Sequence, residues 1–121
     1  MERLYRRFRD RADFAFVYIA EAHAADEWQM PANLADDAVL EQQTTLAERR
    51  ETALASTGRL SLGMPLFVDE MDNHVSTAFA AWPERLVLVG ADGRIAYPGS
   101  PGPFGFSPEQ AEEQLVALLG R

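Results

Sequence analysis

The stretch FAFVYIAEAH, residues 14–23, decides which fold this sequence can adopt. Its first part, Phe14–Ala20, is apolar without interruption and leads directly into Glu21 and His23. A strand with one exposed face alternates apolar and polar residues, so an unbroken apolar run predicts a strand buried on both faces. We therefore expect an inner strand of a sheet that carries two titratable side chains at its carboxyl end.

Helical and strand-like patterns alternate along the rest of the chain. A first helix is predicted at residues 1–11, where the arginines form either the surface of an amphipathic helix or a binding patch. A second helix begins at Thr44 or Thr45 and ends at Gly58. The further predicted elements are buried strands at 64–69 and 85–89, a short helix around 75–81, the second arm of a hairpin at 94–97, and a last helix with a capping box at Ser107, Pro108 and Gln110.

This order of elements predicts an α/β sandwich in a single domain over residues 1–121. Because strands alternate with helices until the closing hairpin, we expect a mostly parallel sheet with a C-terminal β-hairpin and helix. The long polar stretch at 21–40 lies between the first strand and the second helix, and excursions of that length in small domains are usually functional.

The composition excludes several classes of function. The chain has 121 residues and a net charge of −8, which argues against a nucleic-acid surface and against an anionic membrane surface as partner. It has no cysteine, so these residues supply neither a disulfide nor a thiolate. No apolar run approaches the roughly 20 residues of a membrane span. We expect a cytoplasmic protein, and the abundant alanine, with arginine as the only basic side chain besides histidine, indicates a bacterial source.

Five stretches together resemble the iodothyronine deiodinase family, a branch of the thioredoxin-fold superfamily. They are VYIAEAHAADEW at 17–28, LAERR at 46–50, FVDEMDN at 67–73, WPERLVLV at 82–89 and IAYPGSPGPFGFSPEQ at 95–110. The resemblance covers nearly the whole chain. It implies a thioredoxin-like sandwich and a reductive dehalogenation in which a selenocysteine or cysteine is the nucleophile, a thiol is the reductant and a small aromatic or halogenated molecule is the substrate. It also implies no further cofactor in this chain, and a homodimer is compatible with it.

The resemblance assigns roles to four residues. It implies that Glu21 and His23 lie beside the chalcogen and deliver a proton, and that Tyr18 and Arg85 line the substrate pocket. Removal of iodine from an aromatic ring as an iodonium equivalent leaves a carbanion-like carbon, and a histidine that titrates near neutral pH can protonate it. The resemblance also makes the bond between Trp82 and Pro83 a candidate cis peptide.

The sequence departs from the family pattern at two positions and lacks one element. Gln43 stands where the family usually has a second histidine, and Glu27 stands where it has glycine. The family strand that carries the chalcogen, between the counterparts of 14–20 and 85–89, is absent from this chain. We expect that the two flanking strands pair directly, that another chain lies between them, or that the sequence is the N-terminally incomplete reading of a longer selenoprotein gene. The last explanation is favoured, because UGA read as a stop would produce such a sequence.

Three functions remain open at this stage. The first is a deiodinase-like oxidoreductase whose chalcogen lies upstream of Met1, the second is a non-catalytic thioredoxin-fold binding module, and the third is a peroxiredoxin-like peroxidase. Asp69, Asp72 and Asn73 could also suggest a cation site, but three oxygen ligands without a glycine-anchored loop favour a structural turn. His74, in the same stretch, is expected to be solvated.

Overall fold

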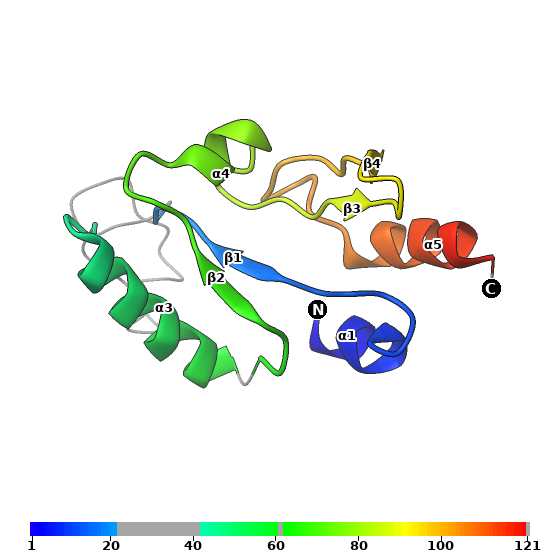
Figure 1. The fold of residues 1–121 in the computed structure, drawn as a ribbon, viewed down its shortest axis with the longest axis horizontal. Coiled ribbons are helices and arrows are strands. Elements are labelled where there is room, and N and C mark those ends of the chain that lie inside the picture. The colour runs from blue at the N-terminus through cyan, green and yellow to red at the C-terminus, as the bar shows by residue number, and fades with distance from the viewer. Residues whose placement is uncertain (22–41, 61, 121) are drawn as a thin grey trace.

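The computed structural model of the protein describes residues 1–21, 42–60 and 62–120. It contains helices on either side of short strands, which confirms the α/β class (Figure 1). In chain order the described elements are α1 (Glu2–Phe8), β1 (Phe16–Tyr18), α3 (Leu46–Leu60), β2 (Leu66–Val68), α4 (His74–Ala78), β3 (Leu88–Val89), β4 (Ile95–Tyr97) and α5 (Pro108–Leu119). His23 and Glu27 lie outside the described residues.

The strands form two separate sheets of two strands each. β1 and β2 are parallel, with Tyr18 opposite Val68, whereas β3 and β4 are antiparallel, with Leu88 opposite Tyr97. The hairpin is confirmed, but the expectation of one mostly parallel sheet is wrong for the described residues. One of the three alternatives for the absent strand, direct pairing of the two flanking strands, is also wrong, because β1 and β3 are not hydrogen-bonded to each other. The arrangement is compatible with a thioredoxin-like fold.

The strands are shorter than the apolar runs that predict them. Only Phe16–Tyr18 of the run 14–20 and only Leu88–Val89 of the run 85–89 lie in a ladder. A strand is defined by hydrogen bonds to a neighbour, and among the described residues each of these two runs has a neighbour on one side only. Val89 is also 53% exposed, so the expectation of a buried strand fails at that residue.

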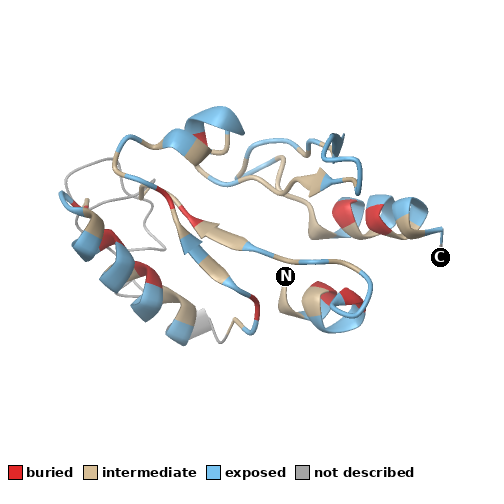
Figure 2. Ribbon diagram, in the orientation of Figure 1, coloured by how far each residue is buried: buried red, intermediate tan, exposed pale blue. Residues whose placement is uncertain are grey.

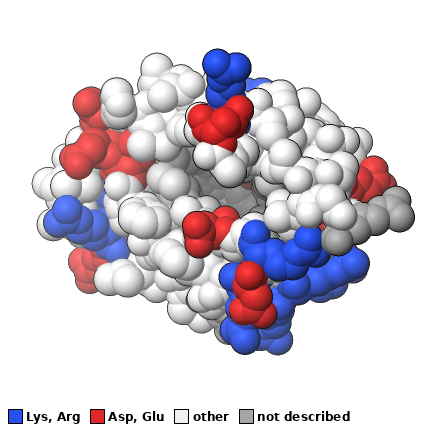
Figure 3. Space-filling model, turned by 45° about the vertical axis from the view of Figure 1, so that its right-hand side comes forward, with Lys and Arg blue, Asp and Glu red and all other residues white. Residues whose placement is uncertain are grey.

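The hydrophobic core lies between the two terminal helices. Leu4 and Phe8 of α1 and Leu115 of α5 form its buried centre, and Figure 2 shows buried residues on both helices. Arg3 and Arg7 bind Glu112 at the same junction. Figure 3 shows arginines gathered on this part of the surface with acidic side chains among them. The amphipathic-helix interpretation of residues 1–11 therefore holds for the described contacts.

Both long helices begin with a side-chain cap. In α3 the Glu48 N–H donates to Thr45 Oγ1 at 3.2 Å, and the Glu48 carboxylate accepts from the N–H of Thr45, which identifies Thr45 as the cap residue. The helix continues past Gly58 to Leu60, contrary to the prediction, because Gly58 does not adopt the positive φ that ends a helix. In α5 the Ser107 hydroxyl accepts from the N–H of Gln110, as predicted.

Two buried charged residues, Asp69 and Arg49, connect α3 to the turn between β2 and α4. The Asp69 side chain is 1% exposed and its two oxygens accept the backbone N–H groups of Glu70, Val75 and Ser76. Arg49, from α3, is 2% exposed and its Nη1 donates to the carbonyls of Asp69 and Glu70 and to Asn73 Oδ1. Asn73 has a φ of 57°, so the turn is structural, as expected, although its side chain bonds Arg49 rather than its own backbone.

Replacement of Asp69 by alanine is expected to destabilise the protein strongly. The substitution leaves three buried or half-buried N–H groups without their acceptor, and loss of bonds to a charged group costs about 3 kcal/mol. Urea denaturation of Asp69→Ala would measure this loss. Asp72→Ala is the control, because Asp72 is an exposed acid of the same turn that accepts only the N–H of His74. Equal stabilities of the two variants would contradict the role given to Asp69.

The cap of α3 is expected to make stability depend on pH. The backbone N–H and the hydroxyl of Thr44, and then the N–H of Thr45, hold the pKa of Glu48 below its ordinary value of 4.5. A lowered pKa in the folded state gives stability that is complete above pH 4.5 and is lost as the pH falls through the folded pKa. The free energy of unfolding of Glu48→Gln should therefore fall less steeply below pH 4.5 than that of the wild type. Glu51→Gln, at an exposed position of the same helix, is the matched control variant.

Candidate active site

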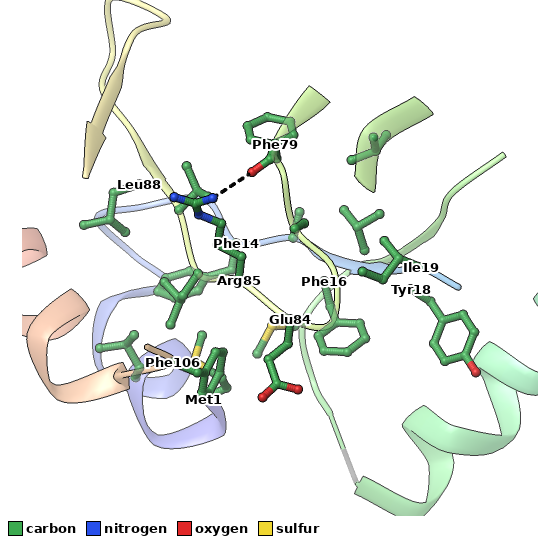
Figure 4. Close-up of a pocket in the computed structure, with 18 of the residues that line it drawn as sticks. Met1, Phe14, Phe16, Tyr18, Ile19, Phe79, Glu84, Arg85, Leu88 and Phe106 are labelled. Atoms are coloured by element: carbon green, nitrogen blue, oxygen red, sulfur yellow. Dashed lines mark hydrogen bonds between the residues drawn. The ribbon is translucent and has the colours of Figure 1, made fainter. Parts of the chain in front are cut away.

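A cleft of about 780 Å³ separates the two sheets. One wall is formed by residues 12–21, which contain β1, and the other by residues 83–88, which lead into β3 (Figure 4). Met1, Leu4, Met64, Val75, Phe79, Ala81, Phe106 and Leu115 complete the lining. Most of these side chains are apolar, and Phe14, Phe16 and Phe106 contribute aromatic rings. The cleft therefore has the size and the character of a site for an apolar or aromatic ligand.

The two walls of the cleft are unpaired strand edges. β1 is bonded to β2 on one side and β3 is bonded to β4 on one side, and neither has a second strand neighbour in the described parts of the chain. Backbone N–H and C=O groups that are shielded from water need hydrogen-bond partners. The walls thus offer backbone donors and acceptors in addition to the apolar side chains.

Tyr18 and Arg85, the predicted substrate-binding residues, lie on opposite walls of this cleft. The Tyr18 side chain is 9% exposed, and Figure 4 shows that it points away from Arg85 and toward α3. Its hydroxyl is buried and no described group hydrogen-bonds to it. The structure therefore places both residues at the cleft but does not bring the hydroxyl and the guanidinium together.

Arg85 binds four backbone carbonyls. Its Nε donates to Pro98 at 2.8 Å, its Nη2 donates to Gly99 at 3.2 Å, and its Nη1 donates to Phe79 and Ala80 at 3.4 and 3.1 Å. A guanidinium has five N–H groups, so one remains for a ligand. Arg85 thus joins the end of α4 to the segment after β4. It can offer its positive charge to a ligand in the cleft, but only one N–H group.

Glu21 lies at the carboxyl end of the β1 wall, as predicted. Its backbone N–H donates to Gln42 Oε1 at 3.3 Å, and its carbonyl accepts from Gln42 Nε2 at 3.1 Å. Gln43, the residue at the family's histidine position, is buried beside this contact at 7% exposure. The role of His23 stays a prediction from sequence, because the residue lies outside the described ranges.

Comparison with known proteins identifies the family. A model of the iodothyronine deiodinase family matches residues 1–118. The chain belongs to the iodothyronine deiodinase family. It is 40% identical over 111 residues to the type I iodothyronine deiodinase of Xenopus laevis, covering 89% of this chain and 40% of that protein. It is 35% identical over 116 residues to the type II enzyme of Fundulus heteroclitus and 31% identical over 115 residues to the human type II enzyme, covering 43% and 42% of them.

The deiodinase-family chain thus spans about two fifths of the length of the curated relatives it matches. Within the described ranges, no helix is both long and apolar enough to cross a membrane. In the same ranges, no three histidine or acidic side chains are grouped so that they could hold a metal ion.

Glu84 is a residue of the cleft that the sequence analysis missed. Its side chain extends into the cleft in Figure 4, and it packs against Gly102, where a Cβ would collide with the carboxylate. The Gly102 N–H also donates to the Glu84 carbonyl at 2.8 Å. The preceding Trp82–Pro83 bond is cis, as expected from the resemblance. The position directly after that proline, at the start of a cleft wall, is the signal that could have identified Glu84.

Replacement of Arg85 by lysine tests whether the guanidinium supports the cleft or is held for a ligand. The three donors of a lysine lie on one nitrogen, so lysine cannot bind the end of α4 and the segment after β4 at the same time as the planar guanidinium does. Arg85→Lys should therefore lose about 1–2 kcal/mol of unfolding free energy. Arg94→Lys, on the exposed β3–β4 turn, should change stability by less than about 0.5 kcal/mol. Wild-type stability of Arg85→Lys would contradict the supporting role.

Proposed function

We propose that this chain is part of a deiodinase-like oxidoreductase that binds an iodinated aromatic substrate in the cleft and works with a selenol or thiol supplied from outside residues 1–121. The observation that carries the proposal is the apolar cleft between two strand edges that no described strand pairs, in a deiodinase-family chain that has no cysteine. The apolar lining suits an aromatic ring. The open edges suit an additional strand, and a nucleophile at the end of such a strand would enter the same cleft.

The additional strand would complete a thioredoxin-like sandwich. The added strand would supply hydrogen-bond partners to backbone groups of both walls, and each buried polar group that is left without a partner costs about 1–3 kcal/mol. Because a domain is stable by only about 5–15 kcal/mol, a strand that pairs with both walls would contribute a large share of the total. In that arrangement β2, β1, the added strand, β3 and β4 would form one continuous sheet, which agrees with the unbroken apolar sequences at 14–20 and 86–89.

The chemistry proposed for this site is a reductive removal of iodine. The chalcogenolate takes the iodine as an iodonium equivalent, and the ring carbon keeps the bonding electrons and takes up one proton. Two thiols then return two electrons to the chalcogen, become a disulfide, and release iodide. The chain itself provides the steps that need no chalcogen, which are binding of the ring and delivery of the proton.

Four residues would divide these tasks. Glu21, at the end of β1, and His23, two positions later, would hold and deliver the proton, and a neighbouring carboxylate can keep an imidazole in the required tautomer. Arg85 would contact the substrate, whereas Tyr18, whose side chain points toward α3, would form part of the opposite wall without a contact through its hydroxyl. The single uncommitted N–H of Arg85 limits it to one direct hydrogen bond, so its contribution to binding would be mainly its charge.

Iodide release by the protein purified from its own host tests this function. With an iodothyronine and a dithiol, the native protein should release iodide, and prior alkylation with N-ethylmaleimide, which contains no iodine, should abolish the release. The recombinant 121-residue chain should release none, because it has no cysteine or selenocysteine. Intact mass of the native protein should exceed 13.5 kDa if the chalcogen belongs to the same polypeptide.

Two other results would replace the proposal with a different function. Rapid consumption of peroxide by the native protein without iodide release would identify a peroxidase. A native mass of 13.5 kDa with neither activity would leave a binding module, since the residues of the chain contain no thiol redox group.

A further inference from the structure

The main chain of β1 loses its ladder before it reaches Glu21. The last hydrogen bond between this strand and the β2 segment runs from the Asp69 N–H to the Tyr18 carbonyl at 2.8 Å. Glu21 lies three residues farther along, on the wall of the cleft. Something other than the sheet must therefore fix the backbone at Glu21.

One side chain supplies that fixed point. The Gln42 carboxamide accepts the Glu21 N–H at 3.3 Å and donates to the Glu21 carbonyl at 3.1 Å, so it binds both polar groups of a single residue. A primary amide carries an acceptor and a donor side by side in one plane, as a neighbouring strand does. Glutamate lacks the donor, lysine lacks the acceptor, and asparagine is shorter by one methylene group.

The Gln42 side chain is attached to a well-anchored part of the molecule. The adjacent Gln43 is buried, and the next two residues form the cap of α3, where the Glu48 carboxylate accepts the N–H groups of Thr44 and Thr45 at 2.8 and 3.2 Å. Two hydrogen bonds to one residue fix both its position and its orientation. The contact therefore fixes the main chain of Glu21 relative to α3.

We propose that Gln42 is a positioning residue that holds Glu21 at the mouth of the cleft by this two-point pairing. It touches neither substrate nor chalcogen and acts only through the backbone of Glu21. The consequence for proton delivery rests on the function proposed above, whereas the pairing itself does not.

Amide hydrogen exchange in the whole native protein tests the pairing. In Gln42→Met, which removes donor and acceptor but keeps the chain length, the Glu21 N–H should exchange at least about tenfold faster than in the wild type. The Asp69 N–H, which is bonded to Tyr18, should exchange at its wild-type rate. Gln114→Met is the control variant, because Gln114 is exposed on α5. An unchanged Glu21 rate in Gln42→Met would overturn the proposal.

A second variant separates two-point pairing from simple packing. In Gln42→Glu the ionised carboxylate still accepts the Glu21 N–H but has nothing to donate to the Glu21 carbonyl. When it is protonated, near or below pH 4.3, the carboxyl group again has one donor and one acceptor. The Glu21 ¹⁵N chemical shift of Gln42→Glu should therefore approach the wild-type value on acidification. Gln42→Met should show no such recovery, although it shares every other titrating group, and recovery in both variants would overturn the proposal.

Activity distinguishes this inference from the function on which it rests. If the native wild type releases iodide, Gln42→Met should lower kcat about tenfold or more with little change in KM, since a misplaced proton donor affects the chemical step. Wild-type kcat with accelerated Glu21 exchange would overturn the positioning role. Absence of iodide release by the wild type, with the exchange result as expected, would reject the proposed function and leave the pairing intact.

Discussion

The need of backbone N–H and C=O groups for partners is the constraint on which this structure depends. Sheets satisfy it for one edge of β1 and one edge of β3, and the other edges face a cleft lined with apolar side chains. Residues 14–20 and 86–89 are apolar without alternation, which is the pattern of strands that are covered on both faces. Edge strands of stable sheets are usually protected by charge, proline or a bulge. The added strand proposed above would give both edges the hydrogen-bond partners that the described residues do not supply.

Charged and amide side chains replace sheet hydrogen bonds around the cleft. Arg49 binds the turn after β2, Arg85 joins the end of α4 to the segment after β4, and Gln42 binds Glu21. In each case one side chain satisfies at least two main-chain or turn groups that no strand reaches. The buried Asp69 does the same for the start of α4. Loops that carry functional residues need this kind of support, because no ladder fixes them.

The elements with strong local signals could be predicted from the sequence. The hairpin at 94–97, the start of α5 at Ser107 and the cap of α3 depend on residues a few positions apart, and all three are present. The Gln110 side chain could not be placed from neighbouring residues alone. It accepts a hydrogen bond from the Tyr97 hydroxyl of β4 instead of completing the capping box. Arg49 and Gln42 could not be found in this way, since their partners lie about twenty residues away in the sequence. The lengths of the strands could not be predicted either, because a strand extends only as far as a neighbouring strand hydrogen-bonds to it, however long the apolar run is.

The charges around the cleft restrict the nucleophile that can work there. Glu84 and Glu21 place two carboxylates at its walls, and the nearby Arg85 has given most of its N–H groups to backbone carbonyls. A thiolate or selenolate is a third negative charge, and like charges in a partly dry site disfavour ionisation. For the nucleophile proposed above, this would favour a selenol, which ionises more readily than a thiol. Gln43 stands where the family has a second histidine, so the proposed function leaves delivery of the proton to Glu21, which Gln42 holds, and to His23, two residues farther along the sequence.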